Sequence, residues 1–333
     1  MRNVEHTKMG PGPMEEFLEE LEKGHAEKTV ENYGFYLERF FIQAKISRVE
    51  EITLEKVNEF RTWLGEYKNP RGGTLSPATQ NYHLIALRAF LKYLAKKGIK
   101  TLALEKIELT KTGQKKISFL SGKDLERFLE APLKPPLSPP FRGRYREGSP
   151  PFRGRIGEKG KIEQDGLIKL RDKAILELLF SSGLKVSEMA GLKRNDINLE
   201  KDEFLISQRL IPLSNQAKYW THKYLAIRAD QEPALFTRHD KAGKEATPLT
   251  PRSIERLVKK YAKIAGISKK ITVQSLRHSF ALEHLARGTE LKEVQKLLGH
   301  KNITSTRIYT QTEVEDLKEI YQAFQSKKRK NKI

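Results

Sequence analysis

The 333-residue sequence contains no cysteine. Disulfide bonds, thiolate zinc sites and cysteine nucleophiles are therefore excluded, and the composition fits a cytoplasmic protein. No apolar run approaches the ~18 residues that a membrane-spanning helix needs, and the polar N-terminal residues lack the apolar core of a signal peptide. No glycine-rich phosphate loop is present, so we expect no nucleotide and no other cofactor.

Acidic residues are scarce relative to basic ones, with 42 Asp and Glu against 63 Lys and Arg, which gives a net charge of +21. A charge of this size predicts attraction to polyanions. Double-stranded DNA is the first candidate partner. An anionic membrane surface is the second, and the missing apolar anchor argues against it. With 38% hydrophobic residues over this length, the chain can form two domains that each have a core.

The N-terminal third has the pattern of four helices. Residues 1–12 are expected to be a flexible leader, and residues 13–100 a compact helical domain. Apolar stripes with helical spacing recur along this range, and Ser76 followed by Pro77 is typical of a helix start. Residues 101–116 have no clear period and several lysines, so we expect an exposed linker there.

A proline-rich segment interrupts the second domain, which we expect to span residues 117–326. Seven of the fifteen prolines lie between Pro132 and Pro151, and the heptapeptide Ser-Pro-Pro-Phe-Arg-Gly-Arg occurs at 138–144 and again at 149–155. Residues 132–165 are therefore predicted to form an insertion loop. Two functions are open: a basic DNA contact or a tolerated insertion without a role. The composition favours the second.

The rest of the second domain is mainly helical with one short hairpin. Helices are expected at 167–181, 251–264, 274–287, 290–298 and 314–324. Ser182-Gly183 should end the first of these. Two β-like runs, Phe204-Leu-Ile-Ser and Leu210-Ile-Pro-Leu, predict the hairpin. The basic residues 327–333 form a tail that is more typical of a solvated charge run than of a specific contact.

An Arg, a His and a Tyr follow one another on turn-separated helical segments. Arg277 can donate a planar fork to a phosphate, and His300 can donate to a phosphate oxygen or orient a tyrosine. Tyr309 is then a candidate nucleophile, because tyrosine is an accepted covalent catalyst. His278, Glu283 and His284 lack the spacing of a metal site, so we expect no metal.

These residues resemble the tyrosine recombinase (phage integrase) family, most closely its Xer-type branch. Leu276-Arg277-His278-Ser279-Phe280 is similar to the second Arg box, Leu298-Gly299-His300 to the His motif and Ile308-Tyr309-Thr310 to the nucleophile. Upstream, Ser182-Gly183-Leu184-Lys185-Val186-Ser187-Glu188-Met189 is similar to the first Arg box. The resemblance covers residues 14–324, and the N-terminal four-helix region looks like the family's SAM-like core-binding domain.

Three positions depart from the family pattern. Lys185 stands where the family has an arginine, and it loses the planar fork while it keeps the charge. Gln274 stands at a position that is usually histidine, and it cannot take up a proton at neutral pH. The turn that carries the family's catalytic lysine looks deleted, because Ser207-Gln208-Arg209 joins the two β-like runs directly. Lys201, in the preceding turn, is a possible substitute.

The resemblance implies a mainly α fold with a small β-sheet, in two domains that close around DNA as a clamp: the SAM-like domain and a catalytic domain. It implies site-specific recombination through a 3′-phosphotyrosyl intermediate, with Tyr309, Arg277, His300, Lys185 and Gln274 as the site residues. It also implies a tetramer on specific DNA sites, alone or with a partner recombinase. The altered positions leave a second hypothesis open: a catalytically degenerate DNA-binding or accessory member of the family.

Overall fold

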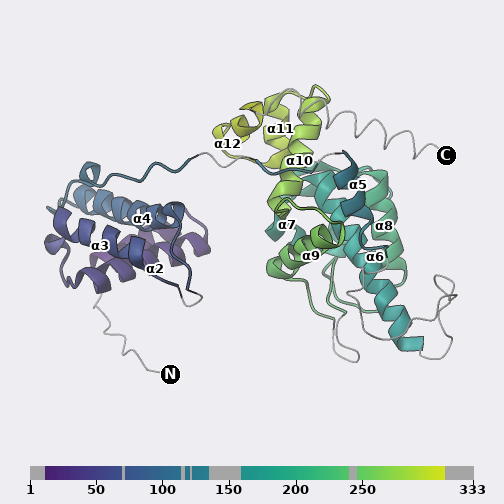
Figure 1. Ribbon diagram of the computed structural model, residues 1–333, viewed down its shortest axis with the longest axis horizontal. Helices are drawn as coiled ribbons and strands as arrows, with labels where there is room; N and C mark the ends of the chain where they lie inside the picture. The colour runs from purple at the N-terminus through teal and green to yellow at the C-terminus, as the bar shows by residue number, and fades with distance from the viewer. Residues whose placement is uncertain are drawn as a thin grey trace. The chain divides into compact units, whose positions relative to one another are not determined.

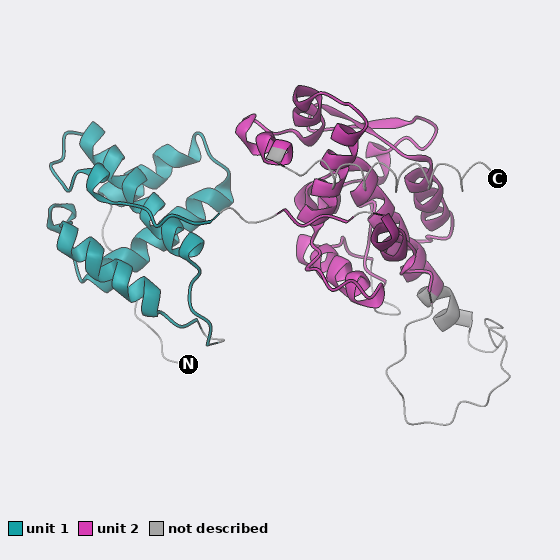
Figure 2. Cartoon of the chain, turned by 45° about the horizontal axis from the view of Figure 1, so that its top comes forward, with its two compact units in different colours: residues 1–115 teal, residues 116–333 magenta. Residues whose placement is uncertain are grey.

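The computed structural model describes residues 12–69, 72–113, 117–120, 122–134, 159–239 and 246–311, with the side chains of 159–165 and 311 left aside. The chain divides into two compact units, residues 1–115 and 116–333 (Figure 2). The predicted leader, the terminal helix at 314–324 and the basic tail lie outside the described residues. None of the described helices is long and apolar enough to cross a membrane.

The first unit is built from four helices: α1 (Pro13–Glu22), α2 (Glu27–Ala44), α3 (Leu54–Glu66) and α4 (Pro77–Lys96) (Figure 1). The predicted start of α4 is confirmed, because the Ser76 hydroxyl accepts a hydrogen bond from the Thr79 amide at 3.2 Å and Pro77 is the first helical residue. Leu37, Val57 and Leu87 are among the fully buried residues of its core.

The segment 101–116, expected to be an exposed linker, is exposed or half-exposed at most of its described positions, but it is attached to the first unit at Ile107 and Thr110. Ile107 is 1% exposed, and a short 3-10 turn, Leu104–Lys106, precedes it. The Asn81 side chain donates to the Thr110 carbonyl at 2.8 Å and accepts from the Thr110 amide at 3.0 Å. Scattered apolar residues and one buried amide are enough to attach this segment to α4, although they follow no helical or strand period.

The second unit contains α5 (Gly122–Glu130), α6 (Lys159–Ser182), α7 (Val186–Gly191), α8 (Asn215–Ala226), α9 (Pro251–Ile264), α10 (Val273–Ala286), α11 (Leu291–Leu298) and α12 (Thr304–Arg307). The 3-10 helix η4 (Ile308–Gln311) follows α12. Strands β1 (Glu203–Ile206) and β2 (Arg209–Pro212) form the predicted antiparallel hairpin, with Leu205 opposite Leu210. Helix α8 was not predicted from the sequence.

The predicted loop 132–165 ends earlier than expected, because α6 begins at Lys159. Residues 159–165, the last seven of the predicted loop, contain no proline, so nothing prevents them from extending the helix. The middle of α6 is buried on all sides from Arg171 to Phe180, and it packs against α8 and α10. The buried α6 is thus the support on which α10 rests.

Gly183 ends α6 in the left-handed conformation, with a φ of 60°. A Cβ atom added there would lie 2.4 Å from the nearest atom of the Phe280 ring on α10. Both the backbone conformation and the close approach of the two elements therefore require glycine.

Gly183→Ala should destabilise the protein by roughly 2–4 kcal/mol, because it adds left-handed strain and displaces a buried ring. Gly191→Ala is the matched control, since nothing lies within 4 Å of a Cβ atom at that helical position. Urea unfolding measures both. A Gly183→Ala variant as stable as Gly191→Ala would contradict the packing of α6 against α10.

Candidate active site

The candidate site forms where the ends of α6 and α11 meet the first turns of α10. Figure 1 shows α10, α11 and α12 grouped at one end of the second unit. Arg277, on α10, is 2% exposed, and its guanidinium donates to the carbonyl oxygens of Gly183, at 2.6 Å, and Leu298. Burial lowers the pKa of Arg277, and the Glu188 carboxylate acts in the opposite direction. Arg277 therefore joins three segments that are far apart in the sequence.

His300 is held at the end of α11 by its own turn. Gly299 adopts a φ of 63°, and the His300 Nδ1 atom lies 2.9 Å from the Thr306 hydroxyl. Burial, together with the charges of Arg277, Lys185 and Arg209, lowers the pKa of His300 to about 4. The ring is therefore neutral at neutral pH, and it lies within the field of three cations.

Tyr309 is 1% exposed, on the 3-10 helix η4, and it packs within the core of the second unit. Its hydroxyl lies 2.9 Å from Nδ1 of His278, and the two rings meet edge to face at 5.4 Å between centroids. Burial raises the pKa of Tyr309 to about 12, with Arg277 acting in the opposite direction. In this structure the phenol is protonated and shielded from solvent.

The two altered positions lie at the surface of the site. Lys185 precedes α7 and has an exposed side chain, while its amide donates to the Glu188 carboxylate at 2.8 Å. Gln274 is exposed in the first turn of α10. Lys201 is exposed in the turn before β1. The structure thus brings Arg277, His300 and Tyr309 together inside the unit and leaves both Lys185 and Gln274 accessible.

The structure also identifies contacts that the sequence analysis missed. His300 was expected to bind a phosphate oxygen or orient Tyr309; in this structure the histidine that contacts the hydroxyl is His278. The only sequence signal for a role of His278 was its position directly after Arg277. That position did not indicate that His278 contacts Tyr309. Among the described residues, no group of three or more His, Asp or Glu side chains could hold a metal ion.

A second missed contact involves Arg209, the first residue of β2. Ser207 and Gln208 form a two-residue turn with φ values of 46° and 63°, so the hairpin has no room for a longer lysine-bearing turn. The Arg209 guanidinium pairs with Glu188 at 2.5 Å and donates to the Leu297 carbonyl at 2.7 Å. This link connects the first turn of α7, next to Lys185, with the last turn of α11, next to His300.

Arg209 also lines a groove beside His300. Its other lining residues include Leu210, Leu297, Ile303 and Arg307. A Cβ atom at Gly299 would lie 2.6 Å from Arg209 Cδ, so the absence of a side chain at Gly299 lets the guanidinium pass close to the backbone.

Arg209→Met should lower the free energy of unfolding by ~3 kcal/mol, because it leaves the Glu188 carboxylate poorly solvated and without its cation. The matched control is Arg127→Met on α5, whose pair with Asp124 is 51% and 36% exposed and should be worth less than ~1 kcal/mol. The double variant Arg209→Met/Glu188→Leu should recover part of the loss. Urea unfolding measures the free energy of unfolding of each variant. If Arg209→Met loses no more stability than Arg127→Met, the Arg209–Glu188 pair contributes nothing beyond an exposed ion pair.

Comparison with known proteins identifies the family to which the chain belongs. Residues 161–316 match the phage integrase family, and residues 14–98 match the phage integrase N-terminal SAM-like domain. Tyrosine recombinase XerC of Thermodesulfovibrio yellowstonii is 30% identical over 318 residues, which cover 90% of this chain and 91% of that protein. Tyrosine recombinase XerA of Pyrococcus horikoshii is 40% identical over 156 residues, which cover 45% of this chain and 53% of that protein.

Solved structures share the fold. XerH site-specific recombinase bound to its palindromic difH substrate, after cleavage, has a TM-score of 0.62 at 22% identity, over 92% of this chain and 82% of that chain. The Tn1549 transposon integrase with circular intermediate DNA has a TM-score of 0.62 at 20% identity, over 92% of this chain and 97% of that chain. The predicted fold class, mainly helical with a small sheet and a SAM-like N-terminal domain, is thereby confirmed. The chain belongs to the tyrosine recombinase family.

Proposed function

We propose that this protein cuts and rejoins double-stranded DNA at a specific site, with Tyr309 as the nucleophile. The observation that carries the proposal is the convergence of Arg277, His300 and Tyr309 around one buried guanidinium. Arg277 donates to two backbone carbonyls, and a guanidinium has five N–H donors in all. Arg277 is 2% exposed in this structure, so its remaining donors can bind the non-bridging oxygens of a phosphate only after the site opens by the movement of Thr304–Gln311 proposed below.

Each residue has a distinct part in the proposed reaction. The phenolic oxygen of Tyr309 attacks phosphorus and forms a 3′-phosphotyrosyl bond, while the 5′ oxygen leaves. Arg277 and Lys185 stabilise the charge on the phosphate, and His300, neutral at neutral pH, assists as a hydrogen-bond donor. Gln274 can hydrogen-bond a phosphate oxygen but cannot accept a proton. The covalent link conserves the bond energy for resealing, so the step needs no cofactor.

The burial of Tyr309 indicates that the described conformation is a resting state. A phosphate cannot reach a hydroxyl in a side chain that is 1% exposed. The segment Thr304–Gln311 consists of one short turn of α12 and the 3-10 helix η4, which are easier to displace than a long helix. We propose that DNA binding moves this segment and exposes the hydroxyl.

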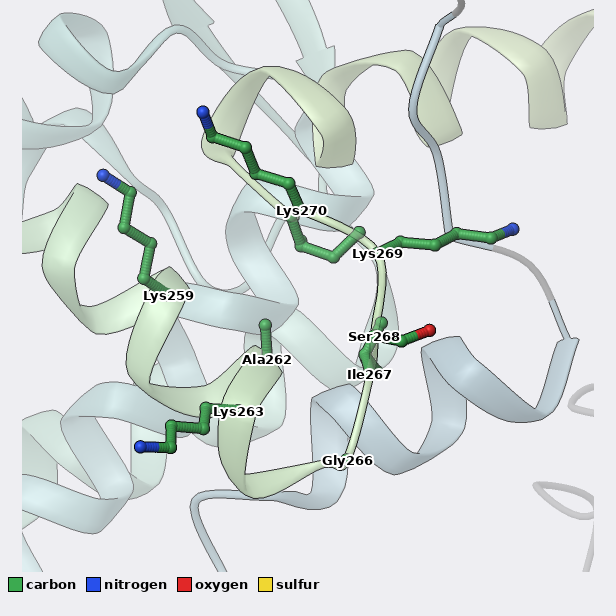
Figure 3. A pocket seen from close by; sticks show the side chains of 9 residues that line it. Lys259, Ala262, Lys263, Gly266, Ile267, Ser268, Lys269 and Lys270 are labelled. Atoms are coloured by element: carbon green, nitrogen blue, oxygen red, sulfur yellow. The ribbon is translucent and has the colours of Figure 1, made fainter. Parts of the chain in front are cut away.

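The basic face of α9 is the proposed DNA contact of the second unit. Arg252, Arg256, Lys259 and Lys263 are exposed and spaced by three or four residues, while Ile254, Val258 and Tyr261 on the opposite face are buried. Figure 3 shows that the side chains of Lys259, Lys263, Lys269 and Lys270 fan outward around the end of α9. Spread cations fit an extended polyanion better than one small anion.

Assembly and partner choice remain part of the proposal. The XerH and Tn1549 integrase structures each contain DNA, which supports duplex DNA as the partner. A tetramer on paired DNA sites, a partner recombinase and a clamp formed by the two units stay predictions. The exchanged terminal helix on which the tetramer would depend lies outside the described residues.

The alternative is a DNA-binding family member with degenerate catalysis. The observation that favours it is the two-residue turn Ser207-Gln208, which leaves no position for a hairpin lysine. Lys185 and Gln274 also favour degenerate catalysis. The arginine that Lys185 replaces has a planar fork that fits a phosphate better, and the histidine that Gln274 replaces can take up a proton. The buried Arg277 and the ordered His300 argue for a site that can still bind phosphate.

Covalent trapping on a nicked duplex tests the proposed function. Wild type should form a protein–DNA adduct, and Tyr309→Phe should form none. Lys185→Arg should raise the rate of adduct formation by up to ~10²-fold, because a planar fork replaces a point charge at the phosphate. Single-turnover assays with labelled DNA measure both effects.

Three outcomes separate the hypotheses. No adduct in wild type or in Lys185→Arg would favour the degenerate member. An adduct in Tyr309→Phe would identify another nucleophile. A fast wild type that Lys185→Arg slows would mean that the site is organised around lysine.

Duplex binding should depend on salt through α9. If Lys259 and Lys263 each neutralise one phosphate, the variant Lys259→Gln/Lys263→Gln should reduce the slope of log affinity against log salt by about 2. The matched control, Lys218→Gln/Lys223→Gln on α8, should leave the slope nearly unchanged. Fluorescence anisotropy measures the slopes. Equal slopes in the two double variants would exclude α9 as the DNA contact.

A further inference from the structure

The partner of the Tyr309 hydroxyl has no role in the function proposed above. His278 lies on α10, directly after Arg277 and one helical turn after Gln274. Its Nδ1 atom is 2.9 Å from the hydroxyl, and it is the only hydrogen-bond partner of that hydroxyl among the described residues. A buried phenol must donate its hydrogen, so Tyr309 is the donor and Nδ1 the acceptor.

The protonation state of His278 agrees with a hydrogen bond that Tyr309 donates and Nδ1 accepts. Burial, together with the neighbouring Arg277 and His300, lowers its pKa to about 4. The ring is therefore neutral at neutral pH, and accepting at Nδ1 places its own hydrogen on Nε2. The His278 side chain is only partly buried, so a proton received at Nδ1 can be passed on to solvent from the other ring nitrogen.

We infer that His278 is the proton acceptor of Tyr309 in the cleavage step, in addition to holding the hydroxyl in the resting state. The inference rests on the function proposed above. It makes His278 a catalytic residue: when the segment Thr304–Gln311 moves, the hydroxyl opens to the phosphate on one side and keeps its contact with Nδ1 of His278 on the other. It also explains how the site can work with Gln274 one turn earlier on the same helix, since Gln274 cannot take the proton.

The step balances without a further reactant. The O–H bond of Tyr309 breaks as its oxygen bonds to phosphorus, and the proton goes to Nδ1 of His278. The P–O5′ bond breaks, and the 5′ oxygen leaves with the electron pair and takes a proton from water. The hydroxide so formed is neutralised by the proton that the imidazolium releases. Transfer from the resting phenol is unfavourable, since the pKa of Tyr309 is about 12 and that of His278 about 4. It must therefore accompany bond formation to phosphorus, which removes the charge from the phenolic oxygen.

The test separates hydrogen bonding from proton transfer. In His278→Asn the amide oxygen takes the place of Nδ1 and can accept the same hydrogen bond, but it cannot take the proton. His278→Gln is the second variant, to be used if the first does not fold. His284→Asn is the control, because His284 is another partly buried histidine of α10 that packs on Phe280 and makes no hydrogen bond to Tyr309 among the described residues.

Single-turnover adduct formation on nicked duplex is measured from pH 5.5 to 9. His278→Asn should be slower than wild type by ~10²–10⁴-fold at pH 7, and its rate should rise with pH as hydroxide replaces the missing base. His284→Asn should follow the wild-type profile. A substrate with sulfur in place of the 5′ bridging oxygen has a leaving group that needs no proton, so the defect of His278→Asn should persist on it.

The possible failures point to different causes. An adduct in wild type that His278→Asn forms equally fast overturns the inference and leaves the proposed function intact. A defect that disappears with the sulfur substrate also overturns it, because His278 would then serve the leaving group. The absence of any adduct in wild type overturns the proposed function and this inference with it.

Discussion

The buried guanidinium of Arg277 is the constraint on which the rest of the site depends. A cation that is 2% exposed must find hydrogen-bond acceptors, and the carbonyl oxygens of Gly183 and Leu298 supply them. These two carbonyls belong to the ends of α6 and α11. Satisfying one buried charge therefore fixes three helices relative to one another and determines where His300 and Tyr309 lie.

The short hairpin β1–β2 also constrains this site, through Arg209. Because its turn has only two residues, Arg209 occupies the first position of β2 and reaches both Glu188 and the Leu297 carbonyl. The turn that would carry a lysine is lost, and a second internal link between α7 and α11 is present. A site held by the buried Arg277 and the partly buried Arg209 is well ordered, but it has fewer mobile cations to offer to a phosphate.

The resting state balances stability against reactivity. Tyr309 fills a place in the core and donates to His278, and burial raises the pKa of its phenol. The same packing keeps the Tyr309 hydroxyl away from solvent. In the proposed mechanism, reactivity depends on a displacement of the short segment Thr304–Gln311, while Arg277, the proposed phosphate ligand, stays between α6 and α11.

The sequence by itself determined the local features. Helix starts such as Ser76-Pro77, the break at Ser182-Gly183 and the hairpin were predictable because caps, left-handed glycines and alternation act between near neighbours. The order and spacing of Arg277, His300 and Tyr309 were enough to indicate the family and its chemistry. Helix α8 and the first turns of α6 were missed, because their apolar pattern is weak or follows a proline-rich segment.

Only the tertiary structure decided which side chains meet. Arg277 bonds a carbonyl 94 residues away, Arg209 one that is 88 residues away, and His278 a hydroxyl 31 residues away. No local pattern encodes such partners, because they result from the packing of whole helices and from the need of each buried polar group for a partner. The need of a buried polar group for a partner also explains why Asn81 bonds Thr110, in a segment that the sequence alone predicted to be an exposed linker.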